Sequence, residues 1–480
     1  MKTQIQYPLH IGRAALSRHR TNSRMVQDTL YGTASLGGDA GYGTVFAVNT
    51  DGTGFTVLHD FTGGSDGNFP ADGLILSSNT LYGTTENGGN YDNGTVFAMT
   101  TNGANFTVLH HFTSQSQNSF TNSDGAHPTA ALILSGNTLY GTAQDGGSAN
   151  KGTVFAVDIN NTNFTVLHRF TATIYDPNFN LTNSDGANPN GRLILSGDTL
   201  YGTASRGGSG GAGTVFAINT NGTDSKVLHD FAAVNYLTLT NSDGANPKAG
   251  LVLSGDMLYG TAFQGGSANA GTVFAVNTNG TVFSNLYNFT YGGDGGKPAG
   301  ELVLSTNTLF GTASAGGDAS VNIGGNGTVF ALNTNGTDFT VVYRFTAGHY
   351  NNDTNFNTLT NSDGAIPQAG LVFSDNTLYG TTSGGGSAGN GTVFRLSFGT
   401  APQLTILGAT LSGTNLVING ANGQSGETNV TLMSPDLTRP LNQWTPVATN
   451  VLNVTGDFTF TATNVVDPKA PRRFYILQTQ

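Results

Sequence analysis

The chain has 480 residues, of which 18 are Lys or Arg and 29 are Asp or Glu, so its net charge is −11. The few scattered cations exclude the basic stripe of a nucleic-acid-binding surface. The sequence contains no run of about 18 apolar residues, which is the length needed to span a membrane. Cys is absent, which excludes disulfides, thiolate metal sites and a Cys nucleophile. The 69 Gly residues, beside many aromatic and β-branched ones, indicate tight turns around a β-rich core.

The first residues predict no regular element. They lack the apolar stretch of a signal peptide, and their Arg residues are typical of a solvated tail. We therefore expect residues 1–24 to be an irregular N-terminal segment.

From residue 25 to residue 399 one unit recurs seven times. Each unit contains LYGT or LFGT, followed by GTVF. The first motif starts at Leu30, Leu81, Leu139, Leu200, Leu258, Leu309 and Leu378. The second starts at Gly43, Gly94, Gly152, Gly213, Gly271, Gly327 and Gly391. Such a period is the sequence signature of a repeat fold.

Each unit offers four β-rich runs separated by turn residues, which predict strands. In the third unit these are Leu132–Ser135, Thr138–Thr142, Gly152–Asp158 and Phe164–Phe170, named a, b, c and d here and in the other units. The c–d link often carries Asn-Gly, which predicts a tight hairpin with positive φ at both residues. Four antiparallel strands repeated seven times predict an all-β, seven-bladed β-propeller. A β-helix, the rival repeat fold, would have shorter coils without these hairpins.

Run d predicts bulk on both faces of the blade. Strict alternation would place Phe55, Val57, His59 and Phe61 on one face, with Leu58 on the other. Sheets that stack on neighbours on both sides need such a pattern.

The terminal units are incomplete by this reading. Ser23–Val26 stands where the first unit should have its run a, and the seventh unit has no run d unless Leu404–Leu407 supplies it. We therefore predict a ring with an exposed strand edge on blade seven and a loose N-terminus.

Length variation is confined to the b–c and d–a links. The Gly of LYGT and the Gly of GTVF are 11 residues apart in six units and 16 apart in the sixth. The last Phe of run d and the Asp of the next Asp-Gly pair are 5 to 18 residues apart. Both links emerge on the same face of an antiparallel blade, and variable loops on a fixed scaffold favour binding on that face.

The Asp-Gly pair occurs in each of six d–a links, at Asp66, Asp124, Asp185, Asp243, Asp294 and Asp363. Asp, then Gly, then Pro three residues later is typical of a turn, which is the favoured interpretation. Two long links, around LTNSDGANP and TNSDGAIP, carry the candidate binding-face residues. These are Tyr175, Asp176, Asn178, Asn180, Asp185, Tyr350, Asp353, Asn355, Asn357 and Asp363. Their oxygens suit Ca²⁺, but neither link has the Gly and distal Glu of a full calcium loop. We therefore expect no cofactor, with Ca²⁺ as the alternative.

Other motifs do not predict catalysis. Gly208–Gly213 matches G-x-G-x-x-G, but a strand follows it where a phosphate loop needs a helix. The recurrent His of run d is replaced by Tyr287 and Tyr343 in later units, which favours packing over a ligand set. No G-x-S-x-G elbow occurs. We expect no catalytic residues and no enzyme activity.

Residues 401–480 do not continue the repeat. Their short β-rich runs predict a small Ig-like β-sandwich, with Trp444 as its core anchor.

The tandem pattern LYGTASxGG, GTVFAVNTNGTxFTVLHDF and DGAxPxAGLxLS resembles the repeat of the Gloeobacter and Verrucomicrobia type, over about residues 25–399. More distantly, its strands resemble pyrroloquinoline-quinone-type propeller repeats. The resemblance implies an extracellular or cell-surface protein and transfers no catalytic residues.

Three functions are compatible with the sequence. The leading hypothesis is a non-catalytic, monomeric protein that binds a glycan or protein partner through the face of the b–c and d–a links. The alternative is a propeller-type polysaccharide hydrolase or lyase, which needs two carboxylates near the channel mouth. The third is a structural spacer that presents the C-terminal domain.

Overall fold

The computed structural model describes residues 2–5, 14–19, 29–235, 237–317, 325–351, 358–398, 405–412, 415–421, 428–434, 443–451, 458–462 and 474–479. By its contacts the chain divides into one unit of residues Thr3–Arg395 and a second unit of Leu396–Gln480 with Met1–Lys2. In the described part of the chain, no helix has the length and apolar character needed to cross a bilayer.

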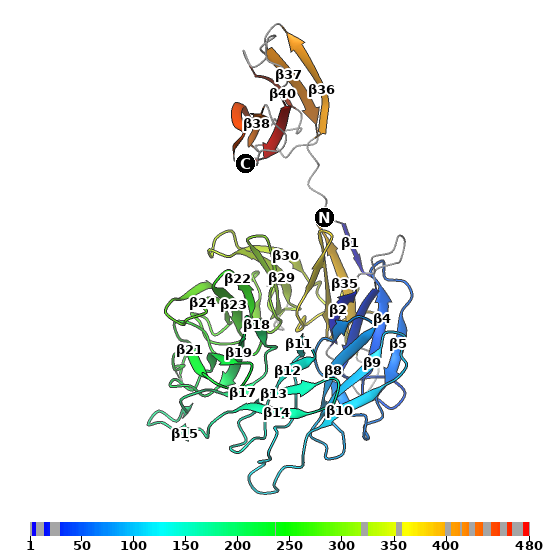
Figure 1. Ribbon diagram of the computed structural model, residues 1–480, viewed down its shortest axis with the longest axis vertical. Coiled ribbons are helices and arrows are strands. Elements are labelled where there is room, and N and C mark those ends of the chain that lie inside the picture. The colour runs from blue at the N-terminus through cyan, green and yellow to red at the C-terminus, as the bar shows by residue number, and fades with distance from the viewer. Residues whose placement is uncertain are drawn as a thin grey trace. The chain divides into compact units, whose positions relative to one another are not determined.

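Seven antiparallel sheets follow one another around a ring as the blades of a β-propeller (Figure 1). Blade 1 has β2 (Ala14–His19), β3 (Thr29–Ala34), β4 (Thr44–Asn49) and β5 (Thr56–Asp60). Blade 2 has β6 (Asn68–Pro70), β7 (Ile75–Ser77), β8 (Thr80–Asn87), β9 (Thr95–Thr100) and β10 (Thr107–His111). Blade 3 has β11 (Ile133–Ser135), β12 (Thr138–Ala143), β13 (Thr153–Asp158) and β14 (Phe164–Arg169). Blade 4 has β17 (Ala187–Pro189), β18 (Ile194–Ser196), β19 (Thr199–Arg206), β20 (Thr214–Asn219) and β21 (Lys226–Asp230).

The remaining blades have the same order. Blade 5 has β22 (Val252–Ser254), β23 (Met257–Ala262), β24 (Thr272–Asn277) and β25 (Phe283–Asn288). Blade 6 has β26 (Gly296–Pro298), β27 (Val303–Ser305), β28 (Thr308–Ala315), β29 (Thr328–Asn333) and β30 (Thr340–Arg344). Blade 7 has β33 (Val372–Ser374), β34 (Thr377–Thr382), β35 (Thr392–Ser397) and β1 (Lys2–Ile5). The predicted all-β, seven-bladed propeller is confirmed.

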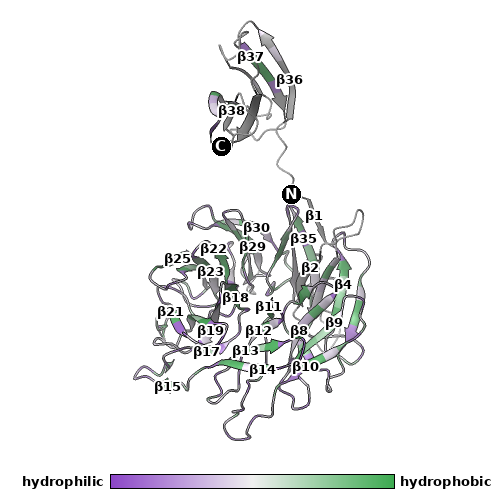
Figure 2. Ribbon diagram, viewed as in Figure 1, coloured by the Kyte–Doolittle hydropathy of each residue, from purple (hydrophilic) through white to green (hydrophobic). Residues whose placement is uncertain are grey.

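The repeated motifs build the contacts between strands and between blades. Gly141 of LYGT lies under the ring of Phe155, and a Cβ at Gly141 would be 2.6 Å from Cζ of that ring and 2.7 Å from Cδ2 of Leu132. Only glycine fits between them. Phe155 and the last Phe of run d, Phe170, are fully buried, and Phe170 packs in one cluster with Phe216 of the next blade. Hydrophobic residues accordingly follow the strands of the ring (Figure 2).

The predicted alternation in run d is wrong because the strand has a β-bulge. In blade 1, Phe46 pairs with Val57 and Val45 pairs with His59, so Leu58 is an extra residue. Because paired residues share a face, Val57 and His59 lie on opposite faces of the sheet. His59 then stacks on Phe106 of blade 2, with ring centroids 3.9 Å apart.

The c–d link is longer than a two-residue hairpin. In blade 4 the N–H of Asn219 donates to the carbonyl of Thr223, and the N–H of Gly222 donates to that of Asn219. Positive φ occurs at Gly222 (83°) and Asp224 (54°) but not at Asn221, so the predicted Asn-Gly conformation is wrong.

The predicted open edge and loose N-terminus are also wrong. In the segment expected to be irregular, β2 completes blade 1 and β1 pairs with β35 as the outer strand of blade 7. Both terminal blades therefore have four strands. Leu30 and Phe46 of blade 1 pack with Tyr379 of blade 7, which closes the ring between its first and last blades.

The C-terminal unit has two antiparallel sheets in its described residues. One has the order β36 (Thr405–Ser412), β37 (Asn415–Ala421) and β40 (Phe458–Ala462). The other has the order β39 (Thr445–Val451), β38 (Thr428–Ser434) and β41 (Phe474–Thr479). Trp444 is buried in a cluster with Leu432. The sandwich arrangement of these sheets stays a prediction.

Candidate functional site

Each described d–a link is fastened by the Asp of its Asp-Gly pair. Asp124 accepts hydrogen bonds from Nε2 of His110 at 2.9 Å, from the N–H of Thr113 at 3.0 Å and from the Thr113 hydroxyl. The same His or Tyr position reaches the Asp in the other links: His59–Asp66 (3.3 Å), His168–Asp185 (3.0 Å), His229–Asp243 (2.9 Å), Tyr287–Asp294 (3.2 Å) and Tyr343–Asp363 (2.7 Å). His and Tyr exchange at this position because both can donate to a carboxylate. Burial, with the negative charge of Asp294, raises the pKa of Tyr287 to about 12.

An Asn two residues before this Asp closes the long links. Oδ1 of Asn183 accepts from the N–H groups of Gly186 (3.0 Å) and Gly208 (2.8 Å), and Nδ2 donates to the carbonyl of Thr171 (2.9 Å). In the short blade 2 link, the backbone carbonyl of Gly64 accepts the two equivalent N–H bonds. The Asn side chain thus stands in for a backbone carbonyl. The repeated stretch LTNSDGANP is accordingly a hydrogen-bonded turn.

The predicted residues of the first long link separate into two groups. Tyr175 lies in β15 (Ile174–Tyr175), which pairs with β16 (Leu181–Thr182), and its side chain is 70% exposed. Asp176 accepts from the N–H groups of Asn178 and Asn180 and from Nδ2 of Asn180. These contacts bring donors to Asp176, whereas Ca²⁺ needs converging oxygens. Asp185 lies apart from them in the turn, where burial raises its pKa but bonds from His168 and Thr171 lower it overall.

The second long link is described only in part. Tyr350 lies in β31 (His349–Asn351), which pairs with β32 (Thr358–Thr360). Asp353, Asn355 and Asn357 lie outside the described residues. Asp363 is fully buried and accepts from Tyr343 and from Thr346, so it has the same turn role as Asp185.

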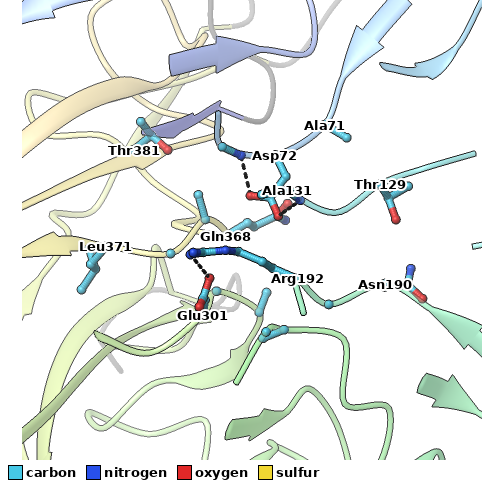
Figure 3. A pocket seen from close by; sticks show the side chains of 18 of the residues that line it. Ala71, Asp72, Thr129, Ala131, Asn190, Arg192, Glu301, Gln368, Leu371 and Thr381 are labelled. Carbon is cyan, nitrogen blue, oxygen red and sulfur yellow. Dashed lines mark hydrogen bonds and ion pairs between the residues drawn. The ribbon is translucent and has the colours of Figure 1, made fainter. Parts of the chain in front are cut away.

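A cavity of about 410 Å³ lies in the central channel of the propeller. Its wall is formed by the residues that end each d–a link, just before the inner strand a of blades 2 to 7. Most are Ala or Gly, so the backbones approach closely. Four of the other lining residues are charged: Asp72, Arg192, Lys248 and Glu301, in blades 2, 4, 5 and 6; Figure 3 labels Asp72, Arg192 and Glu301.

The charged side chains of the channel interact with one another and with the backbone. Nη1 of Arg192 lies 3.4 Å from Oε2 of Glu301. The two carboxylate oxygens of Asp72 accept from the N–H groups of Gly73 (2.7 Å) and Ala131 (2.9 Å), as Figure 3 shows for Ala131. The channel lining therefore has two cations, Arg192 and Lys248, and two carboxylates, Asp72 and Glu301.

Burial raises the pKa of Glu301, the positive charge of Arg192 lowers it, and the negative charge of Asp72 raises it. A quarter of the Glu301 side chain is exposed, but that surface faces the channel and not the outer surface. Within the described residues, no three His, Asp or Glu side chains gather closely enough to hold a metal ion.

The sequence interpretation missed these channel residues because it followed loop length. A usable signal was present: the residue before the apolar quartet of run a is Gly or Ala in four units, at Gly73, Ala131, Gly250 and Gly370, but Arg192 and Glu301 in two others. A charge that interrupts a small-residue position of a repeat indicates a local role.

The sequence matches the Gloeobacter/Verrucomicrobia repeat family over residues 3–179, 118–240 and 236–409. A search of curated proteins gave no significant match. Among solved structures, the GH74 enzyme of Niastella koreensis is similar at 14% identity and a TM-score of 0.50, covering 88% of this chain and 59% of that chain. An oligogalacturonate lyase in complex with manganese is similar at 11% identity and a TM-score of 0.42, covering 81% and 98%. At these identities the likenesses show the fold alone, and this chain spans about three fifths of the GH74 enzyme.

Proposed function

The chain belongs to the Gloeobacter/Verrucomicrobia repeat family, and from this premise we propose that it is a non-catalytic binding protein whose glycan ligand enters the channel cavity. The observation that carries the proposal is a pair of buried polar atoms, Arg192 Nε and Thr129 Oγ1. Both residues line the cavity, and neither atom has a hydrogen-bond partner among the described residues. A buried polar atom without a partner costs about 1–3 kcal/mol, so a ligand that pairs with these atoms is favoured there.

The rest of the lining supports a sugar ligand. Asn190 and Gln368 each add an amide donor and an amide acceptor, and Lys248 adds a charged donor. Sugar hydroxyls both donate and accept, so they match such a mixed set. The volume lies within the roughly 300–1,000 Å³ of small-ligand sites, and a concave cavity fits the end of a chain better than a flat protein surface.

A polysaccharide hydrolase or lyase is the second candidate, because Asp72 and Glu301 line the same cavity and burial raises the pKa of Glu301. Binding is favoured over catalysis because both carboxylates are already engaged. Asp72 accepts two backbone N–H bonds, and Glu301 pairs with Arg192.

The family premise also supports a setting outside the cell or on its surface, as part of the same proposal. Immunodetection of the native protein in cell fractions tests it. Recovery only with cytoplasmic proteins would contradict this part.

Calorimetric titration of the full chain with a panel of oligosaccharides tests the binding proposal. The variant Arg192→Gly with Glu301→Gly places the residue of other units at both positions, so the blades should fold. Lys226→Gln, on the exposed edge strand β21, is the control for a lost surface charge. We expect one glycan class to bind, the double variant to bind at least about tenfold more weakly, and the control to be unchanged.

Two results would contradict the proposal. Absence of binding to any glycan would favour the spacer, and binding unaffected by the double variant would place the ligand elsewhere. Release of shortened or unsaturated sugar products, abolished by Asp72→Ala, would establish the catalytic alternative.

A further inference from the structure

A second cavity, of about 470 Å³, lies where the b–c links of blades 3 and 4 meet the d–a links of blades 4 and 5; we name it the groove. Every residue that lines it is polar or charged, and three of them are cations: Lys151, Arg206 and Lys248. Asn190 and Lys248 line both the groove and the channel, so the two cavities adjoin.

The scaffold does not require these cations. Each occupies a repeat position that holds no cation in any other unit. The equivalents of Lys151 are Tyr42, Asn93, Ala212, Ala270, Asn326 and Asn390. Those of Arg206 are Leu36, Asn87, Asp145, Gln264, Ala315 and Gly384, and those of Lys248 are Ala71, Thr129, Asn190, Ala299 and Gln368. Three separate repeat positions therefore depart from the pattern toward positive charge, and all three meet in one cavity of a chain with net charge −11.

The groove walls have a fixed backbone. Asn188 and Asn246, each just before the Pro of its link, have φ of 55° and 59°. Their N–H groups donate to the carbonyls of Lys151 and Ala212 in the preceding blades, both at 2.8 Å. The same position has positive φ at Phe69, His127, Lys297 and Ile366. Non-glycine residues rarely adopt this conformation, so the repeat holds a variable side chain at each of these points on a constrained backbone.

The charges of the groove favour an anion. Its single carboxylate, Asp145, accepts from Nδ2 of Asn188 at 2.9 Å and lies 3.3 Å from Nδ1 of His127. Neither Lys151 nor Arg206 forms an ion pair within the described residues. The ammonium of Lys248 lies 3.3 Å from the ring centroid of Phe263, a cation–π contact that positions it.

We propose that the groove binds the anionic groups of an acidic glycan, carboxylates of uronic acids or sulfate esters, while the amide side chains bind its hydroxyls. This inference rests on the proposed function, of which it specifies the ligand class. Guanidinium and ammonium groups form their strongest hydrogen bonds with such anions. The groove lining contains no aromatic ring on which a neutral sugar could stack, which favours recognition by charge.

The test compares three hexasaccharides by calorimetric titration of the full chain: one of uronic acid, one sulfated, and one of neutral glucose. Lys151→Asn, Arg206→Gln and Lys248→Gln each introduce the residue of another unit, and Lys226→Gln is the control with the same charge change. We expect an acidic hexamer to bind at least about tenfold more tightly than the neutral one, with a loss of about fivefold to tenfold for each groove variant. Binding should also weaken as salt is raised.

The outcomes separate this inference from the proposed function. Equal binding of acidic and neutral hexamers, lost in the channel double variant but kept in the groove variants, would overturn the acidic ligand and leave the channel site standing. No binding of any hexamer would overturn both. The preferred hexamer identifies carboxylate or sulfate as the anion, and either one supports the inference.

Discussion

The d–a link from blade 4 to blade 5 lacks one hydrogen bond that the other five links have, and restoring it should stabilise the protein. The residue after the last Phe of run d is Thr in blades 1, 2, 3, 5 and 6. Its hydroxyl donates to the turn Asp, as Thr62 does to Asp66 at 2.6 Å. In blade 4 it is Ala232, whose N–H donates to Asp243 at 3.1 and 3.2 Å. The N–H of Thr171 makes the same contacts with Asp185 at 3.1 and 3.3 Å. The backbone is therefore already in position for a Thr at 232.

The expected gain follows from the kind of bond. A hydrogen bond to a charged group contributes about 1.5–3 kcal/mol net, but the Ala232 side chain is exposed, and Thr loses rotamer freedom. We expect Ala232→Thr to raise the free energy of unfolding by about 1 kcal/mol. Chemical denaturation measures the change in the free energy of global unfolding, and hydrogen exchange of the 231–247 peptide shows whether the gain is local.

The neighbouring substitution Ala233→Thr is the matched control, since it adds the same side chain at an exposed position without a turn Asp to bond. In an Asp243→Ala background, Ala232→Thr should give no gain because its acceptor is gone. An equal gain in that background, or none in the wild-type chain, would refute the hydrogen bond from residue 232 to Asp243 as the source of stability.

Three further results are expected. In an NMR titration His127 should have a pKa above 6.5, because Asp145 bonds to its ring, and His59 should have a pKa below 6.5, because it is buried. The contribution of His127 to the free energy of unfolding is then complete below pH 6.5 and is lost as the pH rises through the folded-state pKa. His127→Asn should therefore flatten the plot of unfolding free energy against pH in that range. Arg192→Gly alone should lower the free energy of unfolding by about 1–2 kcal/mol at pH 7, because it leaves Glu301 without its cation; the loss is limited because the Arg192 side chain is 38% exposed. Adding Glu301→Gly should recover most of the lost unfolding free energy in denaturation experiments. Deleting residues 1–5 should leave β35 as an open edge and increase aggregation in light scattering, whereas an unchanged particle size would contradict the role of β1 as the outer strand of blade 7.

The blades could be predicted from sequence because their signals are local and repeated seven times. LYGT, GTVF and the Asp-Gly turn each lie within a few residues, and constant spacings show which runs pair. The strand that closes the ring gives no such signal: KTQI in β1 does not resemble run d, and its partner β35 lies almost 400 residues away. Pairing at that separation is decided by the geometry of the closed ring and not by local pattern.

The bulge at Leu58 and the channel residues escaped prediction for different reasons. An extra residue hardly changes the composition of a strand, so a period-two pattern continued across Leu58 gives no sign of the bulge. The channel charges were visible, but only by comparing equivalent positions across the units. Arg192 and Glu301 are ordinary surface-type residues until one sees that the other units have Gly or Ala there.

Comparing the long and short d–a links shows that link length does not affect the turn at their base. Asn183 bonds to Thr171 at the base of the long link, and Asn122 bonds to Thr113 in the same way. The inserted residues lie beyond this bond, so the turn below it keeps the geometry of the short links. An insert can therefore lengthen without moving the wall of the channel. For this reason the length of a d–a link has little effect on the channel, whereas a charge at an inner position such as Arg192 changes the channel lining directly. Function in this repeat is thus better sought where a unit breaks the pattern at a fixed position than where it adds residues.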